Sequence, residues 1–128
     1  MRPLTPYVLS LLGAATAAFA TYTDTTDSDV VSLTQETFYH FMEEHDLVLA
    51  NFYAPWCRYS KKLAPKFEEA ATELKNDNIP LVKVDCTWEE ELCSDFGIDA
   101  FPTLKVFRGP WSHEPYAGTR QTDSYATC

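Results

Sequence analysis

The sequence has 128 residues and a formal net charge of −9 at pH 7, which fits one acidic domain. Such a protein repels phosphate backbones and anionic membranes, so we expect neither nucleic acid nor a membrane surface as a partner. Its four cysteines lack the Cys-x2–4-Cys spacing of zinc sites and its three histidines are scattered, so we expect no metal site.

Residues 1–20 have the pattern of a secretory signal peptide. Met1-Arg2 precedes a mainly apolar stretch from Tyr7 to Ala20, which ends in the small-residue pattern Ala18-Phe19-Ala20. A membrane anchor is the alternative, but the stretch is shorter than the ~20 residues that a span needs. We therefore expect the protein in the lumen of the endoplasmic reticulum or secreted, where disulfides are permitted. The sequence ends without a Lys-Asp-Glu-Leu retention signal.

Residues 21–29 are rich in Thr and Asp without an aliphatic residue, which predicts a disordered lead-in to a domain over residues 30–128. Strand-like and helix-like stretches alternate in that domain. We predict strands at Val30 to Leu33, Leu47 to Tyr53, Leu81 to Asp85, Thr103 to Phe107 and Glu114 to Ala117, and helices after Thr34, from Cys57 to about Lys75 and from Glu89 to Phe96. The strand-helix-strand order requires a parallel pair of strands, which indicates the α/β class.

The stretch Ala54-Pro55-Trp56-Cys57-Arg58-Tyr59-Ser60-Lys61 closes an apolar strand and opens an amphipathic helix. Cys57 would therefore lie at a helix N-terminus, beside unpaired backbone N–H groups and the cations Arg58 and Lys61. Both features lower the pKa of a thiol and favour the reactive thiolate. We predict that Cys57 is an exposed nucleophile for thiol–disulfide exchange and not an inert structural thiol.

This stretch and Ala100-Phe101-Pro102-Thr103 resemble the first catalytic domain of the protein disulfide isomerases, whose active site is Cys-Gly-His-Cys. The resemblance runs from about Val30 to about Arg120. It implies a thioredoxin-like fold, with a central mixed sheet flanked by helices. It also implies a cis-proline at Pro102 beside the nucleophile, which leaves the Phe101 backbone free to pair with an extended client segment. Trp56, Tyr59, Phe101 and Pro102 would contact such a client.

The family ends in one more long helix, and this sequence stops at Cys128, about where that helix would begin. We therefore expect the fold to lack its final helix. The sequence is then either a fragment of a longer product, which we favour, or a marginal domain that pairs with something else.

The resemblance fails at the second active-site cysteine, which is Ser60 here. A hydroxyl cannot attack a mixed disulfide, so we expect no net oxidase or reductase activity from this site alone. Ser60 could instead donate a hydrogen bond to the Cys57 thiolate. Arg58 would replace part of the electrostatic effect of the family's histidine, whose position is Tyr59.

Asn51 replaces the buried glutamate that takes the proton of the second cysteine in the family. Lys83 on the next strand resembles the partner of that glutamate, and Arg120 matches an arginine that tunes the second cysteine. Without that cysteine the base has no proton to accept, and a neutral amide avoids the cost of a buried charge. We favour this linked loss over random drift at Asn51.

The other three cysteines have different expected roles. Cys86 and Cys93 lie seven residues apart, which suits a small structural disulfide, and fungal isomerase domains carry a similar pair. A second redox site is the alternative. Cys128 is then the odd thiol, for which we expect at most an intermolecular bond, while Cys57 stays free or capped.

These features lead to one main hypothesis and one rival. The main one is an isomerase-like thiol protein that attacks unfolded or disulfide-containing secretory clients through Cys57 and forms mixed disulfides, for isomerisation or client retention. Cys-Arg-Tyr-Ser also resembles the Cys-Arg-Phe-Ser site of a family of retention proteins. We expect no cofactor, although an external thiol such as glutathione could resolve the mixed disulfides. The rival is a redox-inactive thioredoxin-fold module that binds clients, or a fragment of a longer isomerase.

Overall fold

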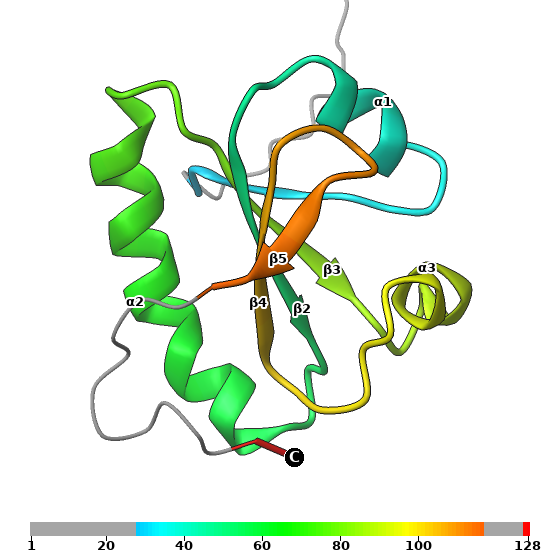
Figure 1. The fold of residues 1–128 in the computed structure, drawn as a ribbon. Coiled ribbons are helices and arrows are strands. Elements are labelled where there is room, and N and C mark those ends of the chain that lie inside the picture. Colours follow the sequence, from blue (N-terminus) through cyan, green and yellow to red (C-terminus); the bar gives the residue numbers. More distant parts are fainter. Residues whose placement is uncertain (1–27, 117–126) are drawn as a thin grey trace, which may run out of the picture.

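The computed structural model describes residues 28–116 and 127–128. Its elements, in chain order, are β1 (Val30–Ser32), α1 (Phe38–Glu43), β2 (Val48–Tyr53), α2 (Arg58–Lys75), β3 (Leu81–Asp85), α3 (Glu90–Asp95), β4 (Thr103–Phe107) and β5 (His113–Pro115). The strands form one sheet in the order β1-β3-β2-β4-β5 (Figure 1). β1, β3 and β2 run parallel, and β4 and β5 pair antiparallel. The predicted α/β class and mixed sheet are confirmed.

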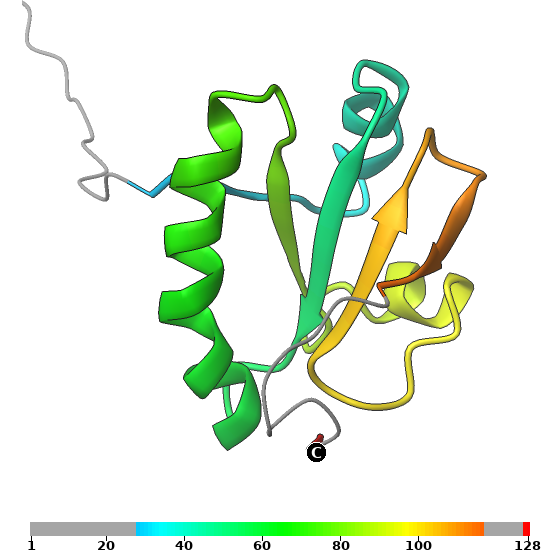
Figure 2. The same cartoon turned by 60° about the vertical axis from the view of Figure 1, so that its left-hand side comes forward.

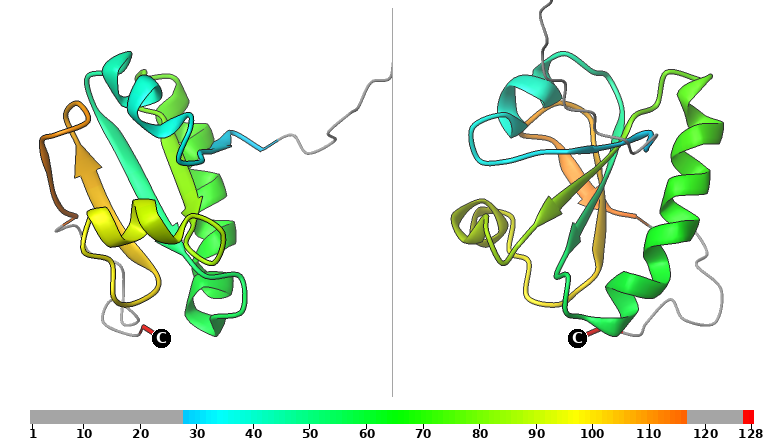
Figure 3. Two further views of the ribbon diagram at one scale, coloured as in Figure 1. Left: turned by 90° about the vertical axis from the view of Figure 1, so that its right-hand side faces the viewer. Right: turned by 180° about the vertical axis from the view of Figure 1, so that it is seen from behind.

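Helices cover both faces of the sheet (Figure 2). α2 packs Phe67 and Ala71 against one face, together with Leu81 and Leu104 from the strands. The opposite face carries the larger aromatic core under α1 and α3, whose fully buried members include Phe38, Met42, Phe52, Leu92 and Phe107. The two views in Figure 3 show α2 and α3 on opposite sides of the sheet. This layered arrangement is the thioredoxin fold.

β2 is the central strand, and its side chains alternate between the two faces. Ala50 and Phe52 belong to the core under α1 and α3, whereas Leu49 packs into the core under α2. Asn51 therefore points to the α2 side of the sheet. The carboxyl end of β2 leads through a short connection into the start of α2. The residues of that connection therefore lie at the carboxyl-terminal end of the central strand.

Several element bounds differ from the prediction. The first helix begins at Phe38, because Thr34 to Thr37 form a turn in which the Thr34 N–H donates to Thr37 Oγ1 at 2.9 Å. β5 ends at Pro115, and Ala117 lies outside the described residues. Gly97 lies just after the third helix. Its φ of 68° lies in the left-handed region that glycine adopts without strain.

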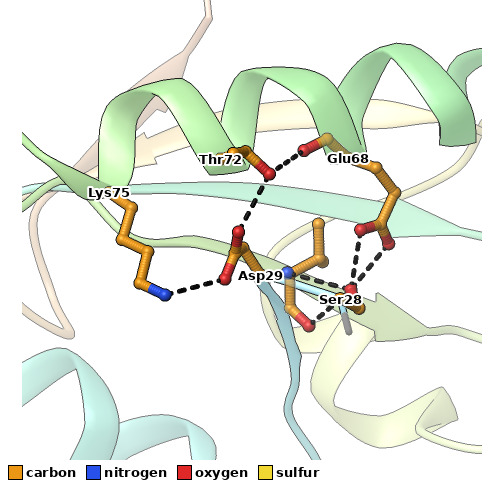
Figure 4. Close-up of polar contacts among 6 residues, drawn as sticks. Ser28, Asp29, Glu68, Thr72 and Lys75 are labelled. Carbon is orange, nitrogen blue, oxygen red and sulfur yellow. Dashed lines mark hydrogen bonds and ion pairs between the residues drawn. The ribbon is translucent and has the colours of Figure 1, made fainter. Parts of the chain in front are cut away.

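Ser28 and Asp29 are held against α2, although the sequence assigned them to a disordered lead-in (Figure 4). Lys75 Nζ and Thr72 Oγ1 donate to the Asp29 carboxylate at 3.0 and 2.9 Å, and Ser28 Oγ donates to Glu68. The hydrogen bond from Lys75, then that from Thr72, lowers the pKa of Asp29. These contacts fix β1 beside α2.

The predicted signal peptide, the rest of the lead-in, Arg120 and the region of the final helix fall on residues 1–27 and 117–126, which lie outside the described residues. Among the helices that the structure describes, none has the length and apolarity required to cross a membrane.

Candidate active site

Cys57 lies at the junction between β2 and α2, as predicted. Its backbone is extended, with φ −82° and ψ 125°, and it is the N-cap residue of α2. The Cys57 N–H donates to the Ala54 carbonyl at 3.1 Å, and the Cys57 carbonyl accepts from Lys61 at 3.0 Å, which begins the helix. The Cys57 sulfur therefore projects where the first backbone N–H groups of α2 have no partner within the helix.

The state of Cys57 differs from the prediction of a free, exposed thiol. Cys57 forms a disulfide with Cys128, with an S–S length of 2.10 Å and a Cα–Cα distance of 6.0 Å, and its residue exposure is 0%. The expected lowering of its pKa thus concerns the reduced protein. The expectation that Cys128 is a spare or intermolecular thiol is wrong for the same reason.

Phe101 and Cys128 pair through their backbones. The Phe101 N–H donates to the Cys128 carbonyl at 3.2 Å, and the Cys128 N–H donates to the Phe101 carbonyl at 2.7 Å. Two such reciprocal bonds are the hydrogen-bonded pair of an antiparallel ladder. The Phe101-Pro102 bond is cis, as the resemblance implied, and Cys57 Sγ lies 3.3 Å from the Phe101 carbonyl oxygen. The backbone edge expected to receive a client therefore holds a cysteine of the chain itself.

Ser60 is buried in the first turn of α2, with 4% of its surface exposed. Its hydroxyl oxygen accepts a long hydrogen bond, 3.4 Å, from the Ala54 N–H. This bond connects the first turn of the helix to the loop that enters it. The expected bond from Ser60 to Cys57 is not among the contacts of the described residues in this disulfide-bonded form.

The aromatic residues expected to contact clients lie around the disulfide. Trp56 is 62% exposed and meets the Phe101 ring edge to face, with ring centres 5.9 Å apart. The Arg58 guanidinium lies 5.7 Å from the centre of the Tyr59 ring. An exposed indole and a half-buried phenyl ring thus form an apolar surface beside the sulfur atoms, while Arg58 adds a positive charge at the start of α2.

Asn51 and Lys83 are the two predicted site residues on the central strands. They are register partners on β2 and β3, but Lys83 Nζ lies 5.8 Å from the centre of the Tyr53 ring. Asn51 is 4% exposed, and its Oδ1 has no hydrogen-bond partner among the described residues. The strand register places the backbones of Asn51 and Lys83 side by side. The long Lys83 side chain nevertheless extends to the Tyr53 ring.

Cys86 and Cys93 are joined by a disulfide, with a Cα–Cα distance of 5.7 Å, which is the pairing that we favoured from the sequence. Both residues are buried in the core under α1 and α3. The Cys86 N–H also donates to the Tyr53 carbonyl at the end of β2. The disulfide from Cys86 to Cys93 therefore links α3 to the ends of the central strands. Burial in the core suits a structural role.

Cys128 is the residue that the structure adds to this site and that the sequence reasoning did not place there. Four cysteines form two pairs, so the assignment of Cys86 to Cys93 leaves Cys57 and Cys128 as the remaining pair. The even number of cysteines was therefore the available signal. The family resemblance points elsewhere, because the family places the second redox cysteine three residues after the first, and here that position is Ser60.

Comparison with known proteins identifies the wider family. The thioredoxin family profile matches residues 29–127. The protein disulfide-isomerase of Aspergillus oryzae is 61% identical over 97% of this chain, and that of Aspergillus niger is 60% identical over 97%. The chain spans about a quarter of the length of these relatives, 24% in both cases.

Solved structures agree with this result. A crystal structure of human ERp44 has a TM-score of 0.68 and 33% identity, and the match covers 76% of this chain and 27% of that one. The first thioredoxin domain of mouse protein disulfide-isomerase A4 has a TM-score of 0.63 and 32% identity, and the match covers 80% of this chain and 79% of that one. The chain therefore belongs to the thioredoxin family.

Proposed function

We propose that this chain carries out thiol–disulfide exchange on protein clients of the secretory pathway, with Cys57 as the nucleophile. The observation that carries the proposal is the disulfide of Cys57 with a cysteine whose backbone pairs with Phe101. An extended peptide with a cysteine would meet the same two features, a backbone edge and a sulfur atom beside it. The similarity to protein disulfide-isomerases supports the same chemistry.

The reaction begins when the reduced Cys57 thiolate attacks one sulfur of a client disulfide. A bond forms between Cys57 and that sulfur, and the other client sulfur leaves as a thiolate and takes a proton from water. The N-terminus of α2 and the cation Arg58 favour the thiolate of Cys57 before the attack. The exposed Trp56 and the Phe101 ring would contact apolar side chains next to the client cysteine.

The turn from Cys57 to Ser60 contains no second thiol. A client thiol can therefore displace Cys57 and leave the client isomerised, or the mixed disulfide persists and retains the client. A small external thiol such as glutathione can also resolve it. We place this activity in the lumen of the endoplasmic reticulum or outside the cell, and it needs no cofactor beyond that thiol.

The test uses reduced protein and a synthetic peptide that carries one internal disulfide. Acid quenching and peptide mapping by mass spectrometry should find the peptide attached to Cys57. The Cys57→Ser variant should form no adduct. The double variant Cys86→Ser, Cys93→Ser is the matched control, and it should still form the adduct if that disulfide is structural. An adduct found only at Cys86 or Cys93 would place the nucleophile elsewhere and refute the proposal.

A further inference from the structure

The contacts of Cys128 bear on the step that follows the attack of Cys57 on a client disulfide. Its sulfur is bonded to Cys57, and both of its backbone polar groups are bonded to Phe101. Cys128 thus has three specific contacts with the reacting region, although 71 positions separate it from Cys57 in the sequence. A cysteine held by its backbone beside a nucleophilic sulfur is positioned to react with it.

We infer that Cys128 is the resolving thiol of this site and supplies the function that Ser60 cannot. The inference rests on the proposed function, in which Cys57 first forms a mixed disulfide with a client. It changes the expected outcome of the reaction, because two thiols of the same chain can reduce a client disulfide completely. The expectation of no net oxidase or reductase activity applies only to the thiols between Cys57 and Ser60.

The electrons balance in two steps. Cys57 attacks the client disulfide, and the first client sulfur leaves as a thiolate that takes a proton from water. Cys128, as a thiolate, then attacks Cys57 Sγ in the mixed disulfide, so that the Cys57–Cys128 bond forms and the bond from Cys57 to the client breaks. The second client sulfur leaves and is protonated in turn. The client gains two electrons, and the protein dithiol becomes the disulfide that the structure contains.

Phe101 couples sulfur exchange to release of the client backbone. It has one N–H and one carbonyl, and both are bonded to Cys128 in the oxidised form. Pro102 has no N–H to offer in their place. A client strand and Cys128 therefore cannot pair with Phe101 at the same time. When Cys128 takes this edge, the client backbone loses its hydrogen bonds to Phe101, and the attack of Cys128 then breaks the covalent bond between the client and Cys57.

A small thiol of the glutathione class restores the dithiol. Cys57 is fully buried in the oxidised form, whereas Cys128 is exposed, so the thiol reaches the bond from the Cys128 side. Its attack on Cys128 releases Cys57 as a thiolate and leaves a mixed disulfide at Cys128. A second small thiol removes that adduct, and the two small thiols become one disulfide.

A single-turnover experiment tests the inference with the same reduced protein and disulfide peptide. Samples quenched with acid at successive times are analysed by mass spectrometry for the adduct at Cys57, the free reduced peptide and the Cys57–Cys128 disulfide. In the unmodified protein, release of the reduced peptide should coincide with formation of that disulfide. In Cys128→Ser the adduct should persist, with release slower by at least about tenfold, because an intramolecular thiol acts at an effective concentration near millimolar. Thr127→Ala, at the exposed neighbouring residue, should behave like the unmodified protein.

The outcomes separate the two proposals. If Cys128→Ser forms the adduct but releases the peptide as fast as the unmodified protein, the resolving role is wrong and the proposed function stands. If neither protein forms an adduct at Cys57, the proposed function itself fails. The time course of the unmodified protein needs no variant, so it decides the question even if Cys128→Ser folds poorly. Peptide release without the Cys57–Cys128 disulfide in that time course would also overturn the inference.

Discussion

Asn51 and Lys83 occupy paired positions on β2 and β3, yet the Lys83 ammonium lies over the Tyr53 ring and Asn51 Oδ1 has no partner among the described residues. A buried acceptor without a hydrogen bond costs free energy, because it has lost its water and gained nothing in return. The site beneath the Cys57 turn therefore contains a polar group that does not stabilise the described part of the fold.

The first prediction is that Asn51→Leu stabilises the protein. The substitution removes the unpaired acceptor and keeps a side chain of similar length next to Leu49 and Leu104, so the free energy of unfolding should rise by about 1 kcal/mol. Asn51→Asp is the matched comparison, and it should destabilise because it places an unpaired charge in a buried position. Urea unfolding at pH 7 measures both. A loss of stability in Asn51→Leu would mean that the amide has a stabilising partner.

The second prediction compares the two disulfides. In the chain-entropy view, a cross-link stabilises by restricting the unfolded chain, and more so for a longer loop. Cys57 and Cys128 are separated by 71 positions, and Cys86 and Cys93 by 7. Loss of the long-range bond in Cys128→Ser should lower the free energy of unfolding by about 4 kcal/mol, from the logarithmic dependence on loop length.

The double variant Cys86→Ser, Cys93→Ser provides the comparison for the short loop. The same relation gives about 2.5 kcal/mol for that loop, before any cost of placing hydroxyl groups in the core. Urea unfolding under non-reducing conditions measures both variants. Equal stability of Cys128→Ser and the unmodified protein would show that the long-range bond does not restrict the unfolded chain in solution.

The third prediction concerns acid and the contacts of Asp29. Its pKa is lowered, first by the hydrogen bond from Lys75 and then by that from Thr72. A carboxyl group whose pKa is lower in the folded state stabilises the fold above its unfolded pKa of about 3.9, and this stabilisation is lost as the pH falls through the folded value. The melting temperature of the unmodified protein should therefore contain a contribution from Asp29 that starts to decline below about pH 4 and is lost as the pH passes the lowered pKa of the folded state.

Asp29→Asn should lack this contribution. Its melting temperature should lie below that of the unmodified protein at pH 6, and the difference should shrink as the pH falls from the unfolded pKa of about 3.9 through the lowered pKa of the folded state. Asp99→Asn is the control, because Asp99 is exposed and makes no ion pair among the described residues. A constant difference between Asp29→Asn and the unmodified protein across this range would contradict the assignment.

The sequence predicted the parts of the site that depend on local pattern. Cys57 at the start of a helix follows from an apolar strand, a short polar turn and an amphipathic stretch, all within neighbouring residues. The cis bond before Pro102 came from the family resemblance, since most X–Pro bonds are trans and no local rule singles this one out. Both expectations agree with the structure because the thioredoxin fold brings the two segments together.

The errors arose from contacts that no local pattern encodes. The bond from Cys57 to Cys128 joins residues 71 positions apart, and no motif within either segment pairs them. The place of the Lys83 ammonium over the Tyr53 ring depends on a side-chain conformation, which the strand register alone does not determine. Prediction from the sequence therefore placed Cys57 at the start of a helix and missed its disulfide partner.

The last prediction tests whether Asn51 and Ser60 changed together. Ser60→Cys, made in a Cys128→Ser background, places a second thiol in the first turn of α2, where the native serine is 4% exposed. The introduced thiol should form a disulfide with Cys57, but it should release mixed disulfides slowly, because Asn51 offers no carboxylate to accept its proton. Adding Asn51→Glu should increase the rate of release beyond the sum of the separate effects, with a coupling free energy of roughly 0.5 to 3 kcal/mol.

The measurement is a double-mutant cycle on release of the disulfide peptide, with all four proteins in the Cys128→Ser background. Asn51→Glu with Ser60 unchanged is the essential control. It should leave the release rate unaltered, since a hydroxyl gives the carboxylate no thiol proton to accept, and it should lower stability by burying an acidic group. Additive effects on the release rate would mean that the two positions changed independently. The unpaired Asn51 amide would then be a residue without a role in the chemistry of Cys57, and the stability gain expected for Asn51→Leu would come at no cost in rate.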